Sequence, residues 1–146
     1  MTREDYYDKK GKPAIVSFGY AAIEREYDIL GNVTRETYWD AVGQPVVSGA
    51  GYDEIRRAYD GNKRLIKEAY YIDGSLCNRS DVLYASLARD YDARGHVILE
   101  RYLDAEEKPI NNSSGIASVR REYDGWTLIR ETKLDAVGNV IEISEP

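Results

Sequence analysis

The chain has 146 residues, 32% of them charged, and a formal net charge of −6, which argues against a nucleic-acid binder that works by neutralising phosphates. No stretch reaches the length of a membrane-spanning helix and the N-terminus has no apolar signal-peptide segment, so we expect no membrane insertion. One cysteine and one histidine offer neither an internal disulfide nor a Cys/His zinc site.

The sequence repeats itself with a step of 32 residues. A Tyr-Asp pair recurs with an arginine two positions before each tyrosine, and a glutamate follows in each copy. The pairs are Tyr27-Asp28, Tyr59-Asp60, Tyr91-Asp92 and Tyr123-Asp124, and the glutamates are Glu36, Glu68, Glu100 and, after a one-residue deletion, Glu131. We therefore predict a single repeat array over residues 1–146, with a partial unit 1–19 and units 20–51, 52–83, 84–115 and 116–146.

Both ends of the chain cut through an ordinary unit. Complete arrays carry atypical terminal repeats that cap them, so we expect an excerpt of a longer protein. The alternative is a complete small protein with permuted ends.

Each unit contains two strand-like segments, which in the first full unit are residues 20–27 and 33–39. Both are rich in Tyr, Val, Ile and Thr. The link Asp28-Ile29-Leu30-Gly31 has the Asp and Gly of a type I hairpin turn, and Asp-x-x-Gly returns at 8–11, 40–43, 92–95 and 135–138. A calcium loop is disfavoured because Ile29 and Leu30 stand where oxygen ligands are needed.

The strand register has two candidates. A three-residue loop with a glycine bulge would place Val33, Arg35, Thr37 and Trp39 beside Ile23 and Tyr27. A four-residue loop would instead place Arg25 opposite Glu36 and Glu26 opposite Arg35, and it would repeat this ion pair as Arg57–Glu68 and Arg89–Glu100. The turn residues favour the first register and the charges favour the second, so both remain open.

A single hairpin is marginally stable in water, so the units should extend one another. The predicted fold class is all-β: tandem antiparallel β-hairpin repeats of 32 residues that form an elongated sheet or solenoid-like array. The segments Pro45–Val47 and Pro109-Ile110 are candidates for a short third strand.

Little in the sequence points to catalysis. His96 replaces a turn asparagine and Cys77 replaces a repeat proline, so neither has the partners of a catalytic nucleophile. The carboxylates recur in every unit, whereas an active site normally interrupts a repeat. We expect no enzyme activity, no cofactor and no bound metal.

The aromatic residues are the remaining candidates for binding. Exposed Tyr and Trp beside carboxylates can stack on sugars, and the candidate ligand-binding residues are Trp39, Tyr38, Tyr70 and Tyr71. The alternative is that these rings only pack the sheet.

On Tyr27-Asp28-x-x-Gly31-Asn32-Val33 and its copies, the chain resembles bacterial YD-repeat proteins, the group that includes RHS-like arrays. It departs from the usual unit in its longer period and in a second Asp-x-x-Gly followed by proline. The resemblance implies a non-catalytic structural or protein-interaction segment of a larger bacterial surface or secreted protein. The alternative function is a repetitive glycan-binding module, so the expected partner is a protein or a glycan and no nucleic acid.

Overall fold

The computed structural model describes residues 2–7 and 20–146, and over this part of the chain it consists of β-strands, turns and loops. The predicted all-β class is confirmed. The strands are β1 (Thr2–Asp5), β2 (Ala22–Tyr27), β3 (Val33–Trp39), β4 (Glu54–Tyr59), β5 (Leu65–Ile72), β6 (Ser75–Leu76), β7 (Ser86–Tyr91), β8 (Val97–Leu103), β9 (Ser118–Asp124), β10 (Thr127–Leu134) and β11 (Val140–Ser144). The described residues form no helix that could cross a membrane.

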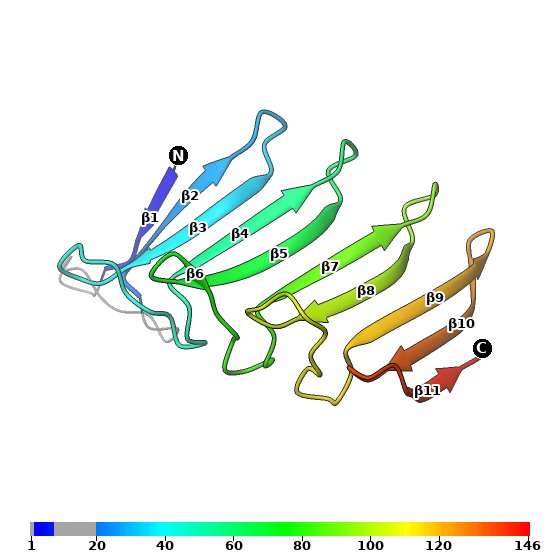
Figure 1. Ribbon diagram of the computed structural model, residues 1–146. Helices are drawn as coiled ribbons and strands as arrows, with labels where there is room; N and C mark the ends of the chain where they lie inside the picture. The colour runs from blue at the N-terminus through cyan, green and yellow to red at the C-terminus, as the bar shows by residue number, and fades with distance from the viewer. Residues whose placement is uncertain (1, 8–19) are drawn as a thin grey trace.

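The strands form one open antiparallel sheet of 11 strands, in which spatial order follows chain order. The path runs β1-β2-β3-β4-β5-β7-β8-β9-β10-β11, and β6 pairs with β5 beside this path. β1 and β11 lie at the two ends of the sheet, and the turns of the four long hairpins all point the same way (Figure 1). The longer connections lie at the other ends of the strands (Figure 1).

Hairpin β2–β3 has the predicted four-residue-loop register along most of its length, with a bulge next to the turn. The placement of Arg35, Thr37 and Trp39 beside Ile23 is wrong, because Ile23 lies opposite Tyr38. Next to the turn, Tyr27 lies opposite Val33. One residue further the register shifts, and from there Arg25 lies opposite Glu36. Thr34 is the extra residue that makes the shift. The same one-residue shift occurs in hairpins β4–β5, β7–β8 and β9–β10.

The Asp-x-x-Gly segments form the predicted turns wherever the structure describes them; the copy at 8–11 lies outside the described residues. The Asp28 carboxylate accepts the backbone N–H groups of Leu30 and Asn32, each at 2.9 Å. Gly31 has φ +87°, a conformation that glycine adopts without strain. Hydrogen bonds from the side chain and backbone of Asn32 hold the pKa of Asp28 below its usual range.

The third strand depends on which residue follows the turn. Pro45 and Pro109 make only isolated bridges, to Trp39 and Leu103, because proline has no N–H with which to continue a ladder. At the equivalent place in the last unit stands Val140, which pairs with Leu134 and begins the full strand β11. The predicted short third strand is therefore not formed at Pro45–Val47 or at Pro109-Ile110, where the structure has an isolated bridge instead.

The core lies on one face of the sheet, which we call the tyrosine face. Ile23, Ile55, Leu87 and Val119 are buried there. Beside them runs an unbroken series of neighbouring tyrosine rings, with centroids 4.7 to 6.2 Å apart. The series is Tyr6, Tyr20, Tyr38, Tyr52, Tyr70, Tyr84 and Tyr102. The loop residue Ala50 belongs to the same buried cluster. Tyrosine thus supplies large side chains to the core of a chain that has one phenylalanine.

Candidate functional site

The two faces of the sheet carry different chemistry because side chains alternate along each strand. Ile23, Arg25, Glu36 and Tyr38 share the tyrosine face through their cross-strand pairing. The pairing places Glu24, Glu26, Arg35, Thr37 and Trp39 together on the opposite face, which we call the tryptophan face. The candidate ligand-binding residues are therefore divided between two surfaces.

Tyr38 and Tyr70 are buried in the tyrosine series, which favours packing over ligand binding for these two residues. Their exposed fractions are 4% and 1%. Burial raises the pKa of both phenols above the usual value. The Tyr70 hydroxyl donates a hydrogen bond to the Glu68 carboxylate. A ring enclosed in this way offers no face to a sugar.

Trp39 and Tyr71 lie on the tryptophan face and are partly exposed. Arginine guanidinium groups of the same chain stand over both rings. The Arg3 group lies 5.8 Å from the Trp39 ring, and the Arg56 group lies 4.1 Å from the Tyr71 ring. These cation–π contacts occupy one face of each ring, so an additional ligand must use what remains.

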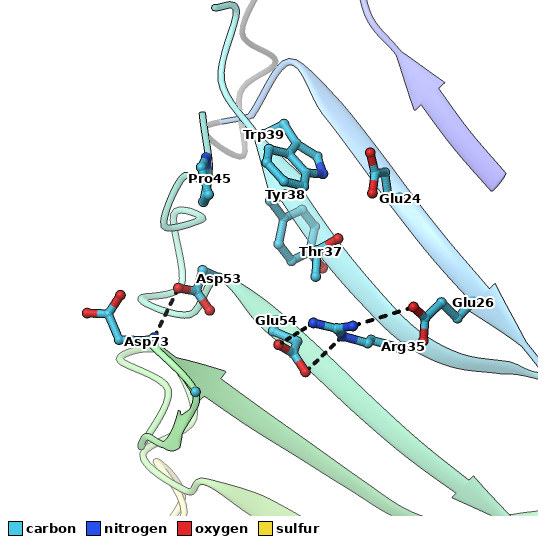
Figure 2. A pocket seen from close by; sticks show the side chains of 11 residues that line it. Glu24, Glu26, Arg35, Thr37, Tyr38, Trp39, Pro45, Asp53, Glu54 and Asp73 are labelled. Atoms are coloured by element: carbon cyan, nitrogen blue, oxygen red, sulfur yellow. Dashed lines mark hydrogen bonds and ion pairs between the residues drawn. The ribbon is translucent and has the colours of Figure 1, made fainter. Parts of the chain in front are cut away.

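A groove of about 420 Å³ opens on the tryptophan face between β2, β3 and β4 (Figure 2). Trp39 and Pro45 form its apolar end, and Arg35 is a basic group within it. Its acidic residues come from two strands and two loops: Glu24 and Glu26 from β2, Glu54 from β4, and Asp53 and Asp73 from loops. The groove thus combines the Trp39 indole with five carboxylates.

Glu54 anchors the inner wall of the groove. Arg35 Nε lies 3.1 Å from its carboxylate, and Arg56 Nε also binds it. Burial alone would raise the pKa of Glu54, but the hydrogen bonds from Arg56 and Arg35 outweigh it and hold the pKa below the usual value. Arg35 also reaches Glu26 at 3.4 Å, so it bridges two strands (Figure 2).

A hydrogen bond between a side chain and the backbone joins two of the loops that line the groove. The Asp53 carboxylate accepts the backbone N–H of Asp73 at 3.1 Å, which joins the start of β4 to the turn after β5 (Figure 2). The Trp39 indole Nε1 is buried and makes no hydrogen bond to the described residues. Strand alternation could have placed Trp39 beside Glu24 and Glu26, but Asp53 and Asp73 reach the groove only through tertiary folding.

The other reactive side chains lie away from this groove. Cys77 is half-buried with its Sγ 3.8 Å from the Gly51 carbonyl, and burial raises the pKa of its thiol. His96 lies 2.9 Å from the Asp92 carboxylate and stacks on Tyr123 at 4.1 Å. The two His96 contacts are those expected of a residue that stabilises a turn. Over residues 2–7 and 20–146, no three His, Cys, Asp or Glu side chains are placed to hold a metal ion together.

No protein family and no curated protein matches this chain. What the chain does must therefore be inferred from its own residues and geometry.

Proposed function

We propose that the chain is a non-catalytic structural or protein-interaction repeat segment of a larger bacterial surface or secreted protein. In this proposal each unit of 32 residues contributes one hairpin to an elongated array. The array gives length and a repetitive surface, since identical units make identical contacts along it.

The observation that carries this proposal is the set of lateral contacts that runs from strand to strand. On the tyrosine face, Arg57 lies 2.7 Å from both Glu36 and Glu68, which come from the neighbouring strands on either side. Arg25 reaches Glu36 at 3.9 Å, and Arg89 reaches Glu100 at 2.9 Å. The tyrosine series runs parallel to these ion pairs. The Arg57–Glu36 pair and the tyrosine contacts join one hairpin to the next, whereas the other three of these ion pairs act within a hairpin. Contacts between hairpins are what a spacer segment requires.

Removing one unit tests the array directly. Deleting residues 88–119 joins Leu87 to Arg120 and keeps the register, so the shortened chain should fold cooperatively. Deleting residues 88–118 leaves one extra residue within a strand, which turns every later side chain to the wrong face. We expect this matched control to unfold or aggregate, as judged by circular dichroism and urea denaturation.

Dyes attached at Thr2→Cys and Ser144→Cys, in a Cys77→Ser background, measure the length. The 32-residue deletion should shorten the distance between dyes by about 10 Å, because two strands at about 4.8 Å each are removed. Equal instability of the two deletions, or an unchanged distance, would contradict the proposal.

The groove on the tryptophan face favours one second candidate, a glycan-binding module. An indole next to carboxylate acceptors suits a sugar ring, which stacks through its C–H face and donates hydroxyl hydrogens. If this candidate is right, binding on a glycan array should disappear in Trp39→Ala. The matched control is Trp126→Ala, since Trp126 is 71% exposed on a hairpin turn. Loss of binding in both variants, or no binding by the unmodified chain, argues against the groove as a glycan site.

A further inference from the structure

The edge of the sheet at β1 differs from every internal strand of the same type. Glu4 lies opposite Ile23 just as Glu36 lies opposite Ile55, so β1 corresponds to β3, the second strand of a hairpin. β3 pairs with β2 on one side and with β4 on the other. β1 pairs with β2 alone among the described residues. The other edge of β1, which we call the free edge, is unpaired within residues 2–7 and 20–146; in β3 the corresponding edge pairs with β2, the first strand of the same hairpin.

The backbone groups along this free edge are ready to pair. Tyr6 donates its N–H to the Ala21 carbonyl at 2.7 Å, so its polar groups point toward β2. Backbone groups alternate sides along an antiparallel strand. The N–H and C=O groups of Arg3 and Asp5 therefore point outward, away from β2.

A glutamate at this edge has one arginine partner, whereas the equivalent glutamate inside the sheet has two. Glu36 lies between two arginines, Arg25 at 3.9 Å and Arg57 at 2.7 Å, and its side chain is 13% exposed. Glu4 has Arg25 on one side at 2.9 Å, and its side chain is 51% exposed. The position across the free edge is where a second arginine would lie.

We propose that the free edge of β1 binds an extended polypeptide strand of the type Val-Arg-Arg-Glu-Tyr, which adds to the sheet antiparallel to β1. The sequence type is that of Val119–Tyr123 in β9. In β9 this strand places Glu122 opposite Arg130 and Arg121 opposite Glu131. The inference goes beyond the proposed structural function and rests on strand pairing alone.

Charge selects this strand over others. In the same register on β1, the glutamate of the added strand faces Arg3, and its two arginines face Glu4 and Asp5. All three cross-strand pairs are then of opposite charge, which is the favourable arrangement in a sheet. The other end of a second copy is a poorer fit, because β11 carries Glu142 and no basic residue. Main-chain hydrogen bonds supply the attachment and the side chains supply the selectivity.

A labelled peptide of residues 117–124 tests the proposal by fluorescence anisotropy with the full chain. It should bind, and a peptide with Arg121→Glu should bind at least about tenfold more weakly, since an attraction becomes a repulsion at Glu4. The Glu4→Arg variant should reverse this preference and bind the Arg121→Glu peptide better. The reversal separates a specific pairing from a folding defect in the variant.

Two further variants locate the site. Asp5→Pro removes an outward N–H without touching the β1–β2 bonds, and it should abolish binding. Ile143→Pro, which weakens the opposite edge at β11, should leave binding unchanged. Equal binding of both peptides, a loss in Ile143→Pro, or no binding at millimolar peptide would overturn the proposal.

Discussion

Replacing Tyr70 with alanine should lower the free energy of unfolding by about 3–5 kcal/mol, the usual range for removing a large buried aromatic ring. Tyr70 is enclosed between Tyr52 and Tyr84, with ring centroids 5.1 and 6.2 Å away. Its loss leaves a cavity in the middle of the tyrosine series, which the β-strands on either side cannot collapse to fill. Urea denaturation measures the change in midpoint and in slope.

Two matched variants separate the contributions to this loss. Tyr70→Phe keeps the ring and removes the hydroxyl, which donates a hydrogen bond to Glu68 and interacts with Arg79, so it should cost about 1–3 kcal/mol. Tyr27→Ala removes an exposed tyrosine and should cost less than about 1 kcal/mol. A Tyr70→Ala variant as stable as Tyr27→Ala would show that the tyrosine series does not form the core.

Replacing Arg57 with alanine should lower the free energy of unfolding by about 2 kcal/mol. Arg57 is 2.7 Å from both Glu36 and Glu68, and the three side chains are between 13% and 19% exposed. Its removal takes the nearest counter-charge from Glu68 and leaves Glu36 with the more distant Arg25, at 3.9 Å. The residual solvent exposure keeps the loss below the 3–5 kcal/mol typical of a fully buried pair.

The neighbouring arginine provides the control. Arg89 has one carboxylate partner, Glu100 at 2.9 Å, and is more exposed, so Arg89→Ala should cost about 1 kcal/mol or less. Arg57→Lys should fall between the two, because a single ammonium group matches two carboxylates less well than a guanidinium fork. If both alanine variants lose the same stability in urea denaturation, the bridging of two strands by Arg57 contributes nothing.

Local chemistry made the hairpins predictable from the sequence. Asp28 and Gly31 specify their turn through side-chain hydrogen bonds and a positive φ, both of which act within five residues. The opposite charges of Arg25 and Glu36 correctly indicated their pairing. Neither candidate register showed that a bulge at Thr34 shifts the pairing next to the turn. A bulge follows from the balance of a whole strand rather than from any residue in it.

The candidate site was only partly predictable. Residue type placed Trp39, Tyr38, Tyr70 and Tyr71 together as binding candidates, but the pairing of β2 with β3 put Tyr38 on the buried face and Trp39 on the other. A one-residue change of register would move Tyr38 to the tryptophan face and Trp39 to the buried face, because side chains alternate with a period of two.

By itself, the sequence determined the strands and the turns, because these depend on neighbours along the chain. It left two registers open, and the tertiary structure decided that Arg25, Arg57 and Arg89 each pair with the glutamate of the next strand. Only the tertiary structure decided which face became the core and which residues met in the groove. The Asp53 carboxylate accepts the backbone N–H of Asp73, which joins the loop before β4 to the turn after β5, and no local pattern encodes that contact. Burial is a property of the assembled sheet, since a tyrosine is buried only when the next strand and its loop cover it.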